Sequence, residues 1–336
     1  MLWIQVIICI ALVIAVSSKL SQSADMVAEK SGLGRNWVGA ILLAGSTSLP
    51  ELATGVSAVN YLDAPDLAAG GIFGSCLFNL MILAILDIIT GGGPLFQQAQ
   101  VSHGLAAGLG SLMLGVAGIG IFLAKRDLDP VLAWVSVPSI VLIVVYLVSA
   151  RLIAKFERRR RSEVLEQESE AYEYEHVKPR QAYLLFAACS IAIVVLGVWL
   201  AWLGDEVVET TGLQESFIGS LLLAITTSLP EVAAGIAAVR LDAVDLAISN
   251  VFGSNIFNMA ILGIYDIVYI KGDLFEKMSQ VHIFSAVIAM MMTSLAIVGL
   301  IYRATRPSRL YLTYDVLGLI VLYLGGMYIV YLGEVS

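Results

Sequence analysis

The chain has 336 residues, 59% of them hydrophobic and 14% charged, with a mean hydropathy of +0.88. This composition excludes a soluble globular protein of this length and favours a membrane protein with several spans. The formal net charge of -8 is not accompanied by a basic patch, so nucleic acid is not an expected partner.

Ten apolar runs in the sequence are long enough to cross a bilayer, which takes about 20 residues. Residues 2–18 resemble a secretory signal, but no basic segment precedes them, so we expect a first membrane helix. The sequence therefore predicts an all-α polytopic membrane protein with ten transmembrane helices. The predicted spans are 2–18, 36–59, 67–89, 101–124 and 131–154, and then 183–203, 215–238, 245–269, 282–302 and 312–333.

A strongly charged stretch separates the two sets of five spans. Arg158 to Arg161 are followed by six glutamates between Glu163 and Glu175. The stretch could form a short surface helix, but without an apolar stripe we expect a solvated, partly flexible linker. The predicted domains are a five-helix repeat over 1–154, a charged cytoplasmic linker over 155–181 and a second five-helix repeat over 182–336.

Basic residues predict the orientation of the chain. If the linker is cytoplasmic, loops on its side hold 15 of the 19 lysines and arginines. Only Lys125, Arg126, Lys271 and Lys277 lie in loops on the other side. The positive-inside rule then favours N and C termini outside the cytoplasm, in a plasma (inner) membrane.

Two stretches 180 residues apart nearly spell the same phrase: residues 46–51 read S-T-S-L-P-E and residues 226–231 read T-T-S-L-P-E. The match continues in the same order with residues 62–67 and 241–246, residues 73–79 and 252–258, and His103 and His282. A unit of five helices is odd, so the second copy must enter the membrane from the opposite side. Such an inverted-topology repeat is typical of secondary transporters, whose substrates bind near the midplane.

Each phrase places a glutamate in an apolar helix, which costs on the order of several kcal/mol and indicates a functional site. Pro50 and Pro230 should break their helices and free the carbonyls of Ser46 and Thr226. Carbonyls beside hydroxyls and carboxylates suit a hard cation such as calcium or sodium. Residues three or four apart share one face of a helix, so we expect four groups of oxygen-bearing side chains, each on one helix face. The groups are Thr47, Ser48 and Glu51; Thr227, Ser228 and Glu231; Ser75 and Asn79; and Ser254 and Asn258.

These halves, each with a T-S-L-P-E helix followed by a G-S-x-x-x-N helix, resemble the alpha-repeats of the cation/calcium antiporters, most closely the sodium/calcium exchanger branch. The resemblance implies that Glu51 and Glu231 are the central calcium ligands. It also implies that the hydroxyls, amides and carbonyls around them complete one calcium site and flanking sodium sites, with backbone carbonyls from Ala44 and Ala224. The implied function is antiport of calcium against sodium by alternating access, without a cofactor other than the transported ions.

The first half departs from the family pattern. Gly71 and Cys76 stand where the family tends to carry amides, which the second half keeps as Asn250 and Asn255. We therefore expect the two halves to contribute unequally to ion affinity or stoichiometry. Asn258 is an amide where the potassium-dependent branch has an aspartate, which favours potassium independence.

Two carboxylates balance one calcium ion, and an empty ionised pair would repel itself, so protons could compete with calcium. Antiport of protons against calcium or another divalent cation is therefore the alternative function. An enzyme is not expected, since GxSxG and HExxH motifs are absent from the sequence. A channel would need subunit symmetry around a pore, whereas this repeat is internal and inverted.

Other repeated polar residues have structural explanations. His103 and His282 are expected to make structural hydrogen bonds rather than to relay protons. Asp87 and Asp266 lie near predicted helix ends, where solvated carboxylates are expected. Four aspartates that precede the third and eighth predicted helices are expected to cap them: Asp63, Asp66, Asp242 and Asp245.

Overall fold

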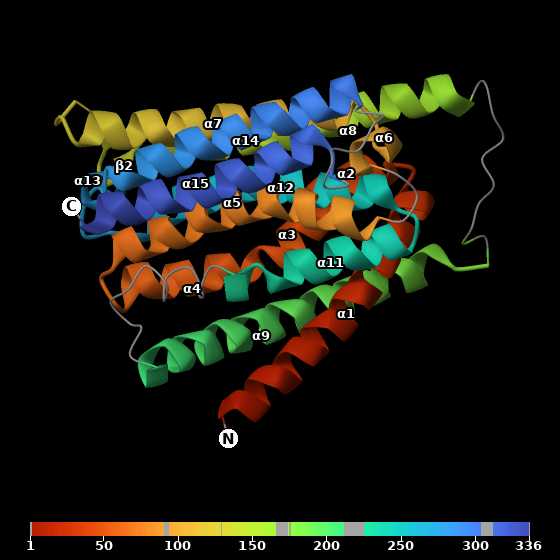
Figure 1. The fold of residues 1–336 in the computed structure, drawn as a ribbon, viewed down its shortest axis with the longest axis horizontal. Coiled ribbons are helices and arrows are strands. Elements are labelled where there is room, and N and C mark those ends of the chain that lie inside the picture. The colour runs from red at the N-terminus through yellow and green to blue at the C-terminus, as the bar shows by residue number, and fades with distance from the viewer. Residues whose placement is uncertain are drawn as a thin grey trace.

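The computed structural model describes residues 2–90, 94–128, 130–165, 174, 176–211, 225–303 and 312–335. Within these ranges, eight helices are long and apolar enough to cross a membrane (Figure 1). They are α1 (Leu2–Ser31), α5 (Pro65–Ile89), α7 (His103–Ala124), α8 (Val137–Leu165), α9 (Pro179–Thr211), α12 (Val244–Val268), α14 (Val281–Tyr302) and α15 (Tyr314–Val335). The protein is therefore an all-α polytopic membrane protein, as predicted.

The two other predicted spans contain the T-S-L-P-E phrases. The first is a succession of short pieces: α2 (Gly34–Trp37), the π-helical turn η1 (Val38–Leu43), α3 (Ala44–Thr47) and α4 (Leu49–Asn60). The chain leaves helical geometry at Ser48, with φ -93° and ψ 5°. Pro50 follows in the first turn of α4, where its missing N–H ends the hydrogen-bond ladder of the preceding turn.

The second phrase breaks in the same way. Ser228 has φ -89° and ψ 6°, and α11 (Leu229–Arg240) begins directly after it with Pro230 in its first turn. Residues 212–224, which include the predicted start of this span, lie outside the described residues. In Figure 1, α4 and α11 run from the middle of the bundle toward opposite ends of the molecule.

The elements of the first half recur in the second with the same lengths. α4 and α11 have 12 residues each, α5 and α12 have 25, and α7 and α14 have 22. The short helices α6 (Leu95–Gln98) and α13 (Leu274–Lys277) have four each. α5 and α12 form the centre of the helix bundle. In the most apolar 18-residue segment of each, 72% and 78% of the residues are buried, whereas the value is 28% for α1 and α9.

Several predicted boundaries differ from the structure, among them the end of α9, which continues to Thr211 instead of stopping at residue 203. α1 continues to Ser31 because its second half is a packed face of buried small residues, where Ser21 Oγ donates to the carbonyl of Ala234 on α11. The fifth span begins at Val137, since β1 (Val131–Leu132) and β2 (Val135–Ser136) form a hairpin before it. α8 then continues to Leu165, so the first part of the predicted flexible linker is helical.

Candidate functional site: a buried oxygen cluster at two helix breaks

Glu51 and Glu231 lie at the beginnings of α4 and α11 and are 3% and 1% exposed. Ser48 Oγ donates a 2.8 Å hydrogen bond to Glu231 Oε1, and Ser228 Oγ donates a 3.3 Å bond to Glu51 Oε1. Each serine belongs to the helix break of one half and reaches the carboxylate of the other. The two phrases therefore meet in one cluster.

The central helices α5 and α12 add hydroxyl and amide groups. Ser228 Oγ lies 3.1 Å from Ser75 Oγ, and Asn79 Nδ2 donates to Asn255 Oδ1 at 3.2 Å. Thr47 Oγ1 lies 3.5 Å from Asn250 Oδ1. Asn250 and Asn255 were not among the predicted ligands. Asn255 completes the G-S-N phrase of the second half and Asn250 lies one helical turn before it, and this position next to Ser254 could have indicated that both lie near the site.

Five oxygens of the predicted ligand set are buried and lack a hydrogen-bond partner within the described part of the chain: Glu51 Oε2, Glu231 Oε2, Asn79 Oδ1, Ser254 Oγ and Asn258 Oδ1. A buried polar atom without a partner costs about 1–3 kcal/mol, and an ionised one costs more. Native structures keep such groups where they serve a purpose.

The donor set matches a hard cation. Calcium takes about six to eight oxygen ligands from carboxylates, carbonyls, amides and water. No group of three or more His, Cys, Asp or Glu side chains gathers among the described residues, so hydroxyls and amides would have to complete the two carboxylates. The cluster could therefore hold a calcium ion, and its hydroxyl and amide oxygens also suit sodium.

Four predicted site residues lie differently from the rest. Ser46 Oγ bonds the carbonyl of Leu42 and lies 2.9 Å from Ser190 Oγ on α9, so its side chain faces away from the glutamates. Thr226 lies against Gly204 of α9. For Ser46 the prediction can therefore concern only the backbone carbonyl. The Ala44 carbonyl accepts from Ser48 N at 3.0 Å, and Ala224 lies outside the described residues.

A cavity of about 750 Å³ reaches the cluster from one end of the molecule. Glu51, Gly71 and Thr227 line it, as do Tyr61 after the end of α4 and Asp66 at the start of α5. Thr227 is a predicted ligand that the structure places at this cavity. Water and ions can therefore approach the carboxylates from the end of the molecule where α4 terminates.

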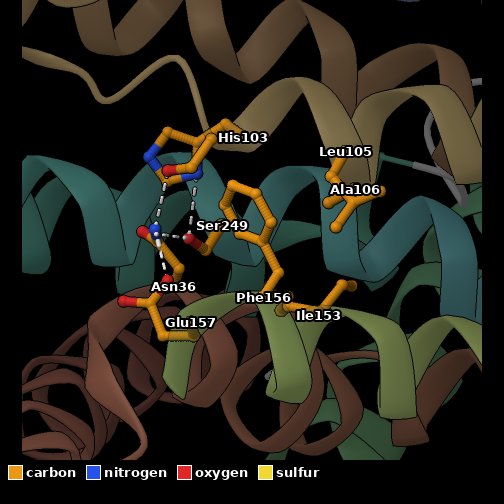
Figure 2. Close-up of a pocket in the computed structure, with 10 residues that line it drawn as sticks. Asn36, His103, Leu105, Ala106, Ile153, Phe156, Glu157 and Ser249 are labelled. Atoms are coloured by element: carbon orange, nitrogen blue, oxygen red, sulfur yellow. Dashed lines mark hydrogen bonds between the residues drawn. The ribbon is translucent and has the colours of Figure 1, made fainter. Parts of the chain in front are cut away.

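At the end nearest the linker, polar side chains of four helices pack together and form a group that we call the closure. Figure 2 shows Asn36, His103, Glu157 and Ser249 converging from α2, α7, α8 and α12. The space that they line has a volume of about 10 Å³. Asn36 Nδ2 donates to Glu157 Oε2 at 3.1 Å, and Ser249 Oγ lies 3.2 Å from His103 Nδ1. The helical extension of α8 thus supplies a half-buried carboxylate, that of Glu157, to this closure.

Two histidine–aspartate pairs join the halves. His103 Nε2 lies 2.7 Å from Asp245 Oδ1, and His282 Nε2 lies 2.9 Å from Asp66 Oδ1. The predicted structural hydrogen bonds of both histidines are confirmed. The predicted capping by these aspartates is wrong, because the N-cap positions are Ala64 and Ala243, and each aspartate is the second residue of its helix and bonds a histidine of the other half.

The other aspartates also differ from expectation. Asp63 and Asp242 have positive φ, 53° and 57°, and form the turns before α5 and α12. Asp266 is fully buried rather than solvated, since it accepts hydrogen bonds from the backbone N–H groups of Ser136 and Leu274. Its counterpart Asp87 accepts from Leu95 N at 2.6 Å and remains partly exposed.

Known proteins resemble this chain in sequence and fold. The family described as sodium/calcium exchanger protein matches residues 1–157 and 181–332. The inner membrane protein YrbG of Escherichia coli (strain K12) is 27% identical over 264 residues, 76% of each chain. Human sodium/potassium/calcium exchanger 5 is 35% identical over 81 residues, 24% of this chain and 16% of that protein. A solved structure of the sodium-calcium exchanger NCX_Mj, soaked with sodium and strontium, superposes with a TM-score of 0.71 at 19% identity, covering 98% of this chain and 99% of that one, which establishes the fold.

Proposed function

Because the chain belongs to the sodium/calcium exchanger family, we propose that it is a secondary antiporter that exchanges calcium for sodium at the cluster around Glu51 and Glu231. The observation that carries this proposal is the crossing of the two helix breaks, which brings two buried carboxylates and their unpartnered oxygens together. Two carboxylates neutralise one calcium ion. The hydroxyls and amides of α5 and α12 provide further oxygens for calcium or sodium.

Alternating access follows from the two ends of the molecule. The cavity of about 750 Å³ gives one side access to the cluster, while the Asn36–Glu157 closure blocks the other. In the second state, the closure would open and the cavity would shrink. A carboxylate pair without a cation resists enclosure in a low dielectric, so the ions would drive the change between states.

We place both termini outside the cytoplasm, in a plasma or bacterial inner membrane. Arg158, Arg159 and Arg160 lie at the linker end of α8, whereas Lys125 and Lys271 lie at the other end, and the positive-inside rule puts the arginine-rich end in the cytoplasm. Under this orientation the cavity faces outward. The division into repeats over 1–154 and 182–336 with a linker over 155–181 belongs to the same proposal.

Proton/calcium antiport is the second candidate, because the two buried carboxylates that would bind calcium could bind protons instead. Purified protein in liposomes distinguishes the two. Uptake of radioactive calcium driven by an imposed sodium gradient supports sodium coupling. Uptake that ignores sodium and follows a pH gradient supports proton coupling.

The glutamate assignment is tested in the same vesicles. Glu51→Gln and Glu231→Gln should each abolish calcium uptake while the protein is recovered folded, because each removes one of the two charges that neutralise calcium. Glu276→Gln, which neutralises a carboxylate that is 57% exposed on α13, is the matched control and should keep wild-type uptake. Wild-type uptake by both glutamine variants at the cluster would refute the assignment.

A further inference from the structure

Tyr265 of α12 makes a direct hydrogen bond to the main chain of a site glutamate. Its hydroxyl donates to the backbone carbonyl of Glu51 at 2.6 Å, and the side chain is 1% exposed. This carbonyl lies in the first turn of α4, directly after the helix break. The phenol therefore ties the beginning of α4 to α12, the most buried of the eight membrane-length helices in the described part of the chain.

Gly55 makes this approach possible. A Cβ at position 55 would overlap the hydroxyl and the adjacent ring carbon of Tyr265. The absence of a side chain at Gly55 lets the ring pass over α4 and reach the carbonyl one turn earlier. Gly55 and Tyr265 both line the cavity that leads to Glu51, so this contact forms part of its wall.

The second half has no equivalent bond. By the alignment of the two halves, Gly55 corresponds to Gly235 and Tyr265 to Leu86. A Cβ at Gly235 would lie 3.3 Å from Leu86 Cδ1, so the packing recurs without the hydroxyl. The helix of Glu231 is instead bonded through the Ala234 carbonyl to Ser21 of α1. The two carboxylates are thus anchored to different parts of the molecule, Glu51 to the buried centre and Glu231 to a peripheral helix.

We propose that Tyr265 is a positioning residue that fixes the start of α4, and with it the Glu51 carboxylate, for cation binding. The consequence for calcium rests on the proposed function, whereas the positioning of α4 does not. The hydroxyls of Ser228, at 3.3 Å, and of Ser75 face the Glu51 carboxylate, and they can bond it only where the main chain of α4 holds it. Loss of one such bond should raise the calcium concentration for half-maximal uptake roughly fivefold.

The test compares Tyr265→Phe with Tyr323→Phe. Tyr323 on α15 is also buried, at 8% exposure, and its ring contacts that of Phe78, so Tyr323→Phe also removes one buried phenol hydroxyl and is the control. The first measurement is hydrogen–deuterium exchange of the backbone amides of 51–60 in the purified protein. Exchange should accelerate in Tyr265→Phe only, because the start of α4 then opens more readily.

The second measurement is calcium uptake into liposomes. Tyr265→Phe should raise the half-saturating calcium concentration with a maximal rate within about twofold of wild type, since the hydroxyl affects binding more than turnover. Unchanged exchange in 51–60, or equal acceleration in both variants, would overturn the positioning of α4. Accelerated exchange with wild-type calcium affinity would overturn its link to binding. Absence of calcium uptake in the wild type would refute the proposed function, and the exchange measurement would still decide the role of Tyr265.

Discussion

Ser48 and Glu231 belong to opposite halves of the chain, yet Ser48 Oγ lies 2.8 Å from Glu231 Oε1. The corresponding contact between Ser228 and Glu51 is longer, at 3.3 Å, and Ser228 also contacts Ser75. Hydrogen bonds to carboxylates are strongest when short. The two carboxylates therefore share one arrangement of partners but are not held equally.

This inequality predicts different effects of removing the two hydroxyls. Ser48→Ala should raise the half-saturating calcium concentration roughly 5- to 10-fold and Ser228→Ala about threefold or less, because the shorter bond holds its carboxylate more firmly. Calcium uptake into liposomes measures both. Ser149→Ala, which removes a buried hydroxyl bonded only within α8, is the control and should behave as wild type. A larger effect of Ser228→Ala would contradict the prediction.

The close approach of α12 to η1 predicts a site where even a methyl group is not tolerated. A Cβ at Gly253 would overlap the backbone of Ala40, which cannot move aside as a side chain can. Gly253→Ala should therefore lower the free energy of unfolding by about 1–3 kcal/mol or prevent recovery of folded protein. Thermal unfolding in detergent measures this loss. Gly71→Ala is the control, since nothing lies within 4 Å of a Cβ at Gly71, and equal melting temperatures for the two variants would exclude the packing role.

The two histidine–aspartate pairs should differ in their contribution to stability. The Asp245 side chain is 16% exposed beside His103, whereas that of Asp66 is 52% exposed beside His282. Asp245→Asn should cost about 1.5–3 kcal/mol, because a buried charge-assisted bond is weakened, and Asp66→Asn less than about 1 kcal/mol. Melting temperatures in detergent compare them. A larger destabilisation by Asp66→Asn would contradict this order.

Access to the cluster predicts a one-sided reaction with thiol reagents. Gly71→Cys places a thiol in the cavity, whereas Asn250→Cys places one at the equivalent, fully buried position of α12. A charged, membrane-impermeant reagent added on the side of the termini should modify the first at least about tenfold faster, because reactivity follows access. The native cysteines are buried and give the background: Cys9, Cys76 and Cys189. Modification of Gly71→Cys only from the linker side would reverse the proposed orientation of the cavity.

Much of this architecture follows from local sequence. Apolar length predicts eight of the membrane helices, and Pro50 predicts that its own helix is broken. The repetition of the phrase also indicates that Glu51 and Glu231 meet, because inverted halves place equivalent residues near one midplane. These features depend on short stretches whose physical preference does not change with their neighbours.

Contacts between the halves could not be predicted in the same way. Pro50 indicated that the Ser46 carbonyl is free, but no local pattern could show that the Ser46 hydroxyl would meet Ser190 of α9. The role of Tyr265 depends on a glycine 210 residues earlier in the chain, a pairing that no local pattern encodes. Asp245 looked like a helix cap because its position favours one, and only packing against α7 brings His103 within 2.7 Å.

The two histidine–aspartate pairs make, within a single chain, the kind of contact that an isologous interface makes between two identical subunits. A histidine of the first half meets an aspartate of the second, and the equivalent histidine of the second meets the equivalent aspartate of the first. Two identical subunits related by a two-fold axis make contacts of this kind. A free five-helix half would thus carry both sides of the contact, so two copies of one half, inserted in opposite orientations, have the polar complementarity needed to recognise each other.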